Sequence, residues 1–229
     1  MKIVTSSLRM CKTAGKGMVL SGLFVIVPAS AAIDVEMDRR APAGYSIRST
    51  NSSESRADAA SDREEIFDLL DLYALAMDTQ HWDLFDRIFM PDAIIDYGEH
   101  MRWDSLESFK KAFAEMHEPL DSSTHIMGNQ QVRIRGSEAH AFTYGQFRLI
   151  RALKGKDGNS WDATGWYDDR LVRTDRGWRI ASRRYRLAWW GGNPLVLGLT
   201  AEEASSLKTY SIRNEAEDNN IIYLRKISE

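Results

Sequence analysis

His125 is the residue of this sequence with the best prospect of acid–base chemistry near neutral pH. A neutral imidazole has a pKa close to physiological pH, so it can remove a proton from carbon as a general base. One ring nitrogen must then be held by a partner, and a buried carboxylate fixes the tautomer and stabilises the cation that forms. Our hypothesis is that Asp78 is this partner. The structural alternatives are an aspartate that only caps a helix and a histidine that is hydrogen-bonded in the core.

Apart from Cys11, the sequence lacks the residues and motifs that thiolate, metal-dependent, nucleotide-dependent or serine-nucleophile catalysis would need. Cys11 is the only cysteine, so a chain that loses its N-terminus has no disulfide, thiolate nucleophile or cysteine-bound metal. The five histidines show no metal-binding spacing such as His-Glu-x-x-His, and no nucleotide-binding glycine loop or serine nucleophile elbow occurs. We therefore expect neither a metal nor a cofactor. The formal charge of −3 gives no broad cationic surface for nucleic acid.

The candidate pair must be positioned by a helical segment and a β-rich segment that follows it. A Ser-x-x-Glu capping box predicts that the first helix begins at Ser61, and apolar residues then recur at helical spacing as far as Met77. The other elements expected here are a short helix over Trp82–Phe89 stopped by Pro91, a strand over Ala93–Tyr97, and a helix with the apolar stripe Leu106, Phe109, Phe113 and Met116.

Long stretches of β-branched and aromatic residues make up the following part of the chain. Turn signals separate them at Gly136, Gly158 and Gly177. Helices followed by antiparallel strands predict an α+β fold, and strands this long predict a curved, cone-shaped antiparallel sheet with the N-terminal helices enclosing a cavity. The expected strands are His125–Ile134, Ala139–Leu153, Trp161–Thr174 and Trp178–Ala188.

The ends of the chain differ in composition from this ordered domain, expected over 61–194. Residues 1–31 combine a basic start, a short apolar run and an Ala29-Ser30-Ala31 cleavage site, which predicts a signal peptide and a periplasmic or secreted protein, or a cytoplasmic one if the start codon is miscalled. The apolar run is too short for a membrane span. Residues 32–60 are expected to be a disordered linker. Residues 195–229 form a C-terminal extension in which Ile221–Leu224 could be a short strand or a docking segment.

The order of these elements resembles the nuclear-transport-factor-2-like superfamily, and within it the SnoaL-like and scytalone-dehydratase-like branch. The resemblance covers Ser61 to about Pro194, and the order of the motifs carries it because none is specific alone. The motifs are LYALAMD at 72–78, LFDRIFMPDA at 84–93, THIMGN at 124–129, GWYDDRLVR at 165–173 and GWRIASRR at 177–184. This superfamily contains enzymes and binding proteins, so its fold does not define a function.

The resemblance assigns roles to three residues. In dehydratases and dehydrohalogenases of this branch, an aspartate at the end of the first helix pairs with a histidine that enters a strand, and Asp78 and His125 match these positions. Tyr73 matches a tyrosine that polarises a substrate oxygen. Five residues turn an ideal helix by about 140°, so Tyr73 and Asp78 can converge only if the helix ends near Asp78. The alternative is that Tyr73 is a core aromatic residue.

Five further residues are candidates for substrate binding. Strand parity places Asn129 on the face of His125 and places Arg184 on the face of Trp178. Arg184 would otherwise form a salt bridge with Asp168 or Asp169. The tyrosines would line the cavity or simply pack, and the Trp189–Trp190 pair after the last strand would form a lid, an oligomer contact or a core plug. The five are Tyr97, Asn129, Tyr144, Tyr167 and Arg184.

These observations favour a cofactor-free lyase, of the dehydratase or dehydrohalogenase type, that acts on a small apolar, aromatic or polycyclic substrate. One alternative is an isomerase or epoxide hydrolase with a carboxylate base such as Asp96. The other is a protein without catalytic activity, either a small-molecule binder or a partner like the β subunit of ring-hydroxylating dioxygenases. The resemblance implies a homodimer or homotrimer assembled through the exposed face of the sheet.

Overall fold

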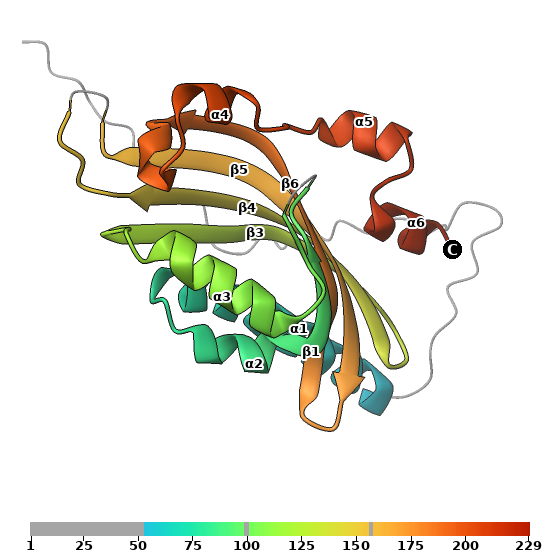
Figure 1. The fold of residues 1–229 in the computed structure, drawn as a ribbon. Helices are drawn as coiled ribbons and strands as arrows, with labels where there is room; N and C mark the ends of the chain where they lie inside the picture. Colours follow the sequence, from blue (N-terminus) through green and yellow to red (C-terminus); the bar gives the residue numbers. More distant parts are fainter. Residues whose placement is uncertain (1–52, 99–100, 156–157) are drawn as a thin grey trace, which may run out of the picture. The chain divides into compact units, whose positions relative to one another are not determined.

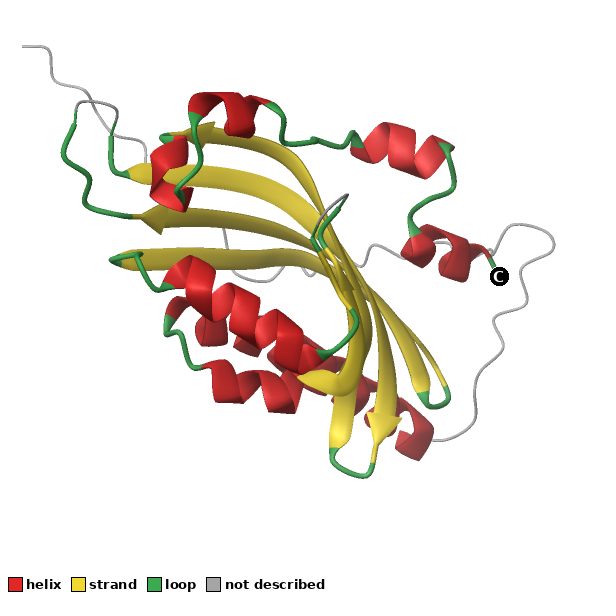
Figure 2. Ribbon diagram, in the orientation of Figure 1, coloured by secondary structure: helices red, strands yellow, loops and turns green. Residues whose placement is uncertain are grey.

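The structure is a computed structural model, and it describes residues 53–98, 101–155 and 158–229. In this part of the chain a strongly curved sheet of six strands holds helices α1 to α3 within its concave side (Figures 1 and 2). The strand order is β2-β1-β6-β5-β4-β3, and all neighbours are antiparallel except β1 and β6. The predicted α+β fold with a curved sheet and N-terminal helices is confirmed, and the sheet is open.

The elements succeed one another with short connections. The sheet consists of β1 Phe89–Asp96, β2 Arg102–Trp103, β3 Ser122–Arg135, β4 Glu138–Ile150, β5 Ser160–Thr174 and β6 Gly177–Gly192. The helices are α1 Ser53–Asp78, η1 Trp82–Leu84, α2 Phe85–Ile88, α3 Leu106–His117, η2 Pro194–Leu197, α4 Ala201–Ser205, α5 Ile212–Glu217 and α6 Ile222–Ser228. No helix of the described residues is long and apolar enough to cross a membrane.

Helix α1 begins at Ser53, so the prediction that it starts at Ser61 is wrong. Two acidic side chains at the expected start contact a distant strand: Asp62 accepts a hydrogen bond from the Trp178 indole at 3.3 Å, and Glu65, just after the box, accepts one from the Trp178 backbone at 2.8 Å. Residues 53–60 are helical and do not belong to a linker. The predicted signal peptide and residues 32–52 of the predicted linker lie outside the described residues.

The segment after α1 contains less helix than the sequence predicts. Only Trp82–Ile88 is helical, as η1 and α2, and Phe89 already begins strand β1. The strand therefore contains Pro91, which cannot donate a backbone hydrogen bond. It is accommodated because the pairing between β1 and β6 is irregular from Phe89 to Ile94.

Helix α3 follows its predicted pattern closely. The hydroxyl of Ser105 caps the helix by accepting a hydrogen bond from the Ser108 backbone at 3.3 Å. Leu106, Phe109 and Phe113 are buried against the core. His117 is buried as well and extends the same face by one turn.

The C-terminal part of the chain corrects two predictions. Strand β6 continues to Gly192, so the two tryptophans belong to a strand and do not form a lid: Trp190 stacks on Trp161, whereas Trp189 is 56% exposed. Ile221–Leu224 is not a strand, since helix α6 begins at Ile222. The carboxylate of Asp168 accepts hydrogen bonds from the first two backbone amides of that helix, at 2.6 and 3.1 Å.

Candidate active site

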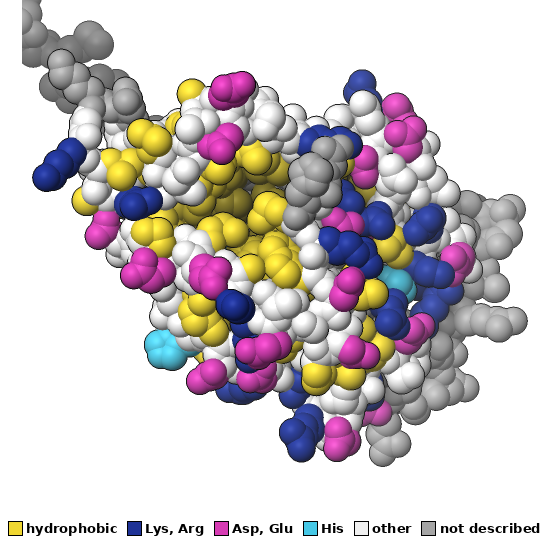
Figure 3. All heavy atoms as spheres, in the orientation of Figure 1, with side chains coloured by type: hydrophobic (Ala, Val, Ile, Leu, Met, Phe, Trp, Pro, Cys, Tyr) yellow, Lys and Arg dark blue, Asp and Glu magenta, His cyan; other side chains and the backbone are white. Residues whose placement is uncertain are grey.

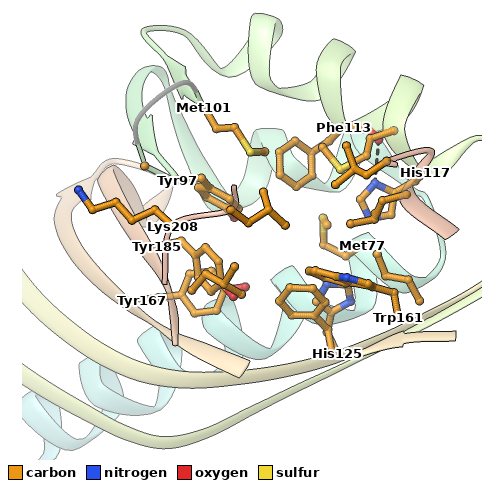
Figure 4. A pocket seen from close by; sticks show the side chains of 18 of the residues that line it. Met77, Tyr97, Met101, Phe113, His117, His125, Trp161, Tyr167, Tyr185 and Lys208 are labelled. Atoms are coloured by element: carbon orange, nitrogen blue, oxygen red, sulfur yellow. Dashed lines mark hydrogen bonds between the residues drawn. The ribbon is translucent and has the colours of Figure 1, made fainter. Parts of the chain in front are cut away.

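A largely apolar cavity of about 380 Å³ lies between the concave face of the sheet, helices α1 and α3, and the C-terminal segment. Its mouth is visible as a hollow with hydrophobic walls in Figure 3. Close up, His117, His125 and Trp161 lie toward one end of the cavity, and Tyr97, Tyr167 and Tyr185 lie toward the other (Figure 4). A volume of this size suits a small organic molecule.

Asp78 and His125 are in direct contact although they are 47 residues apart. Asp78 is the last residue of α1, and its Oδ1 lies 2.6 Å from Nδ1 of His125 on β3. The carboxylate also accepts hydrogen bonds from the His125 backbone amide at 2.8 Å and from the Ser123 hydroxyl at 2.9 Å. The His125 side chain is only 5% exposed. Three hydrogen bonds thus fix the carboxylate, and the carboxylate fixes the imidazole.

This contact defines the chemical state of the pair. Burial raises the pKa of Asp78, but the hydrogen bonds from His125 and Ser123 outweigh it, so the pKa lies below its ordinary value and the carboxylate is charged at neutral pH. An ionised carboxylate can only accept, so the neutral imidazole carries its hydrogen on Nδ1. Its Nε2 then presents a lone pair. His125 lines the cavity and stacks on Phe147 with a centroid separation of 5.1 Å.

Two tyrosine hydroxyls meet at the cavity wall. The Tyr73 and Tyr97 oxygens are 2.6 Å apart, and both residues line the cavity. Burial raises the pKa of Tyr73 and raises that of Tyr97 well above its ordinary value, so both keep their protons at neutral pH. Tyr73 and Asp78 need not share a helix face, because Tyr73 reaches the cavity directly whereas Asp78 contacts it through His125.

A buried ion pair supports the tyrosines from behind. Arg183 and Asp169 are both fully buried, and Nε and Nη2 of the arginine donate to the two carboxylate oxygens at 2.9 and 2.8 Å. The guanidinium carbon lies 4.2 Å from the ring centroid of Tyr73 and 4.5 Å from that of Tyr167. Burial lowers the pKa of Arg183, but the adjacent carboxylate more than offsets it, so the guanidinium stays charged. This pair was not predicted from the sequence.

Two glycines make room for the other tyrosines. A Cβ atom on Gly145 would lie 2.6 Å from the Tyr167 ring, and one on Gly165 would lie 2.7 Å from the Tyr185 hydroxyl and 2.2 Å from the backbone oxygen of Arg186. The rings therefore lie over strand positions that have no side chain. This arrangement places Tyr167 and Tyr185 flat along the sheet and leaves space for the cavity above them.

The structure brings five of the eight predicted site residues together. Tyr73, Tyr97, Tyr167 and His125 line the cavity, and Asp78 contacts His125. The other three, Asn129, Tyr144 and Arg184, do not line it.

Strand alternation predicted that Asn129 and Arg184 face the cavity, and a β-bulge explains why each prediction is wrong. Pairing of β3 with β4 is irregular between Gly128 and Gln131, and Asn129 has a φ of 51° and an exposed side chain. In β6 an extra residue between Ile180 and Ser182 reverses which of the following side chains face the concave side of the sheet. Arg183 therefore points into the core.

Arg184 and Tyr144 both lie on the outer side of the sheet. Arg184 donates to the backbone oxygen of Asn220 at 2.8 Å and lies 3.9 Å from Asp96, so its predicted salt bridge with Asp168 or Asp169 does not form. Tyr144 is 42% exposed and its ring contacts that of Phe142.

Asp96, the candidate for a carboxylate base, is engaged elsewhere. Its two oxygens accept hydrogen bonds from the Arg186 guanidinium at 3.1 and 3.0 Å, and the Gly98 amide donates to it at 2.9 Å. Burial raises the pKa of Asp96, but these hydrogen bonds lower it by more. The pKa of Asp96 therefore lies below its ordinary value. Asp96 does not line the cavity. A weakly basic carboxylate outside the cavity is poorly suited to remove a proton from a bound molecule.

Two parts of the cavity wall were not predicted from the sequence. His117 lines it from the end of α3, and its position four residues after Phe113 was the available signal. The C-terminal segment contributes Leu197, Leu199 and Leu207. No sequence periodicity indicated their contribution. Among the described residues, no three histidine, aspartate or glutamate side chains cluster as metal ligands would.

Comparison with known proteins identifies the family. The SnoaL-like domain matches residues 58–184. The chain belongs to the SnoaL-like family. The Mycobacterium tuberculosis protein Rv2910c, itself uncharacterised, is 35% identical over 127 residues, which are 54% of this chain and 83% of that protein. The matched domain contains Asp78, His125, Tyr73, Tyr97 and Tyr167, whereas Tyr185 and the C-terminal wall of the cavity lie beyond it.

Solved structures show the same fold. A candidate scytalone dehydratase from Novosphingobium aromaticivorans superposes with a TM-score of 0.55 at 16% identity, covering 60% of this chain and 91% of that one. The crystal structure of LinA gives a TM-score of 0.55 at 16% identity, covering 61% and 94%. At these identities the neighbours show the fold alone, and it is the fold that the sequence resemblance predicted.

Proposed function

We propose that this SnoaL-like protein is a cofactor-independent lyase that eliminates water or hydrogen halide from a small, largely apolar carbonyl compound. The observation that carries the proposal is the 2.6 Å contact of Asp78 with Nδ1 of His125, because it leaves the basic Nε2 for the cavity. A histidine oriented in this way by a charged carboxylate is the usual form of an imidazole general base.

The proposed reaction uses groups that already line the cavity. Nε2 of His125 takes a proton from the carbon next to the carbonyl, and Asp78 stabilises the imidazolium. The C–H electron pair forms the new C=C bond as the bond to the neighbouring hydroxyl or halide breaks. One hydroxyl of the Tyr73–Tyr97 pair donates a hydrogen bond to the carbonyl oxygen, where negative charge develops, and the other hydroxyl donates to the first. The imidazolium then returns its proton to the departing hydroxide, or to solvent when a halide leaves.

The same first step would serve an isomerase, which differs only in returning the proton to another carbon. Because Asp96 is paired with Arg186 outside the cavity, we propose His125 as the base for this alternative as well. The non-catalytic alternative, a small-molecule binder or a dioxygenase β-subunit-like partner, predicts that ligands bind without any loss of a proton from carbon.

Exchange of hydrogen for deuterium tests the proton transfer without knowledge of the natural substrate. 4-Phenylcyclohexanone, an apolar ketone with acidic C–H groups, is incubated with the protein in D₂O and followed by NMR. We expect wild-type protein to accelerate exchange next to the carbonyl, His125→Gln to abolish the acceleration, and His81→Asn, which removes an exposed imidazole, to retain it. Binding without accelerated exchange would refute the general-base role and favour the binder.

The products of two further probes separate lyase from isomerase. A β-hydroxy or β-chloro cyclohexanone yields a conjugated enone by elimination, whereas cyclohex-3-enone yields it by isomerisation, and the enone absorbs in the ultraviolet. The lyase proposal requires that elimination be the faster reaction and that it be lost in His125→Gln.

A further inference from the structure

The cavity contains a second imidazole, His117, whose surroundings differ from those of His125. Nδ1 of His117 lies 2.8 Å from the backbone oxygen of Phe113, one helical turn earlier. Because a carbonyl oxygen can only accept, the hydrogen of the neutral ring lies on Nδ1. Within the described part of the chain no hydrogen bond reaches Nε2, so this atom carries a lone pair and no partner.

The ring of His117 is held in place on both sides. It stacks on Phe113 with a centroid separation of 5.6 Å and meets the edge of Trp82 at 5.5 Å. The residue is only 2% exposed, yet it lines the cavity, and Figure 4 shows it toward the same end as His125. An unpartnered acceptor on a cavity wall is available to a hydrogen-bond donor of a bound ligand.

The two histidines have different hydrogen-bond partners. Nδ1 of His125 faces the Asp78 carboxylate, whereas Nδ1 of His117 faces a backbone carbonyl oxygen. Burial lowers the pKa of His117 to about 4, so it is neutral at physiological pH. A neutral imidazole with its hydrogen already donated can accept one hydrogen bond and give none. His117 therefore cannot protonate a leaving group.

We infer that Nε2 of His117 is a specificity-determining acceptor for a hydroxyl group of the ligand, so that the substrate class is a neutral, hydroxylated aromatic or alicyclic ketone. The carbonyl of such a molecule accepts the one hydrogen that the Tyr73–Tyr97 pair has free, and its hydroxyl donates to His117. Ethers, carboxylates and halides have no hydrogen to donate at that position. The inference rests on the proposed function only in the choice of a carbonyl compound.

Matched ligands test this acceptor by binding alone. 4-Phenylcyclohexanone, its 2-, 3- and 4-hydroxyphenyl counterparts and their methyl ethers are titrated by calorimetry. We expect wild-type protein to bind one hydroxyphenyl isomer about five- to tenfold more tightly than its methyl ether and the parent ketone, the usual effect of one hydrogen bond.

Two variants at the same position make the test specific. His117→Asn keeps a donor for the Phe113 oxygen and removes the acceptor, so it should bind hydroxyl compound and ether equally. His117→Gln places an amide oxygen near the former Nε2 and should recover part of the preference. Circular dichroism checks that both are folded. The inference is overturned if wild-type protein prefers no hydroxyphenyl isomer, or if His117→Asn keeps the full preference.

A third variant separates this inference from the proposed function. His125→Gln should lose deuterium exchange and still prefer the hydroxyl compound. If wild-type protein shows the hydroxyl preference but no exchange, the lyase proposal fails and the assignment of His117 stands. If wild-type protein shows exchange without a hydroxyl preference, the assignment of His117 fails and the lyase proposal stands.

Discussion

Replacing Asp78 by asparagine tests the central contact of the candidate active site. The carboxylate accepts three hydrogen bonds, from Nδ1 and the backbone amide of His125 and from the Ser123 hydroxyl. Asparagine has one oxygen, and it will keep the bond from the backbone amide, which can only donate. Its NH₂ group then faces Nδ1, so the imidazole must carry its hydrogen on Nε2 instead.

The size of the expected loss follows from this change of tautomer. With hydrogen on Nε2, His125 presents a donor to the cavity and can no longer accept a proton there. A positioned general base typically contributes about 10²- to 10⁴-fold to rate, so we expect Asp78→Asn to slow deuterium exchange by about that factor. This is about 3 to 5 kcal/mol of activation free energy. Ligand affinity should change little, because Asp78 does not line the cavity.

The assay compares exchange rate and ligand affinity in three proteins. Asp68→Asn removes an exposed carboxylate from the same helix and should behave as wild type. If Asp78→Asn exchanges within about threefold of wild type, far short of a general base's contribution, the carboxylate does not set the tautomer. The reasoning about the pair would then be refuted.

Four further predictions concern other parts of the molecule. Since the pKa of His117 falls to about 4 on folding, the free energy of unfolding should decrease as pH falls from about 6.5 to 4, by about 3 kcal/mol, and urea denaturation of His117→Asn should lack this decrease. Gly165→Ala should lower the free energy of unfolding by about 1–3 kcal/mol because its Cβ would clash, whereas Gly155→Ala, with nothing within 4 Å, should not. If the outer face of the sheet is the homodimer or homotrimer interface, replacing the exposed Trp189 by lysine should yield a monomer by light scattering, with ligand binding unchanged. N-terminal sequencing of the exported protein should begin at Ala32, and a product that starts at Met1 would exclude the signal peptide.

Much of the architecture could be predicted because it depends on local patterns. The stripe Leu106, Phe109 and Phe113 predicts both the existence of α3 and its buried face, and the structure agrees. The alternation and turn glycines of the later chain similarly predict an antiparallel meander. The contact of Asp78 with His125 is different, because no local pattern relates residues 47 positions apart. It was predictable only through the resemblance to a family.

The predictions that failed depend on long-range contacts. Ser61 begins a convincing capping box, but Asp62 and Glu65 contact Trp178 of a distant strand, and α1 extends through the box. Asn129 was misplaced because a bulge cannot be read from alternation alone. A single inserted residue reverses which side chains face the cavity.

The bulge in β6 also has consequences for the choice of substrate. It turns Arg183 inward, where Asp169 neutralises it, and turns Arg184 outward to contact the C-terminal segment. Neither guanidinium lines the cavity, so β6 supplies no cation there for an anionic substrate. Instead the strand places the ring of Tyr185 on the cavity wall, beside other tyrosines that are protonated at neutral pH. The wall opposite the histidines thus offers hydroxyl donors, and this favours a neutral carbonyl compound on which negative charge develops only during the reaction.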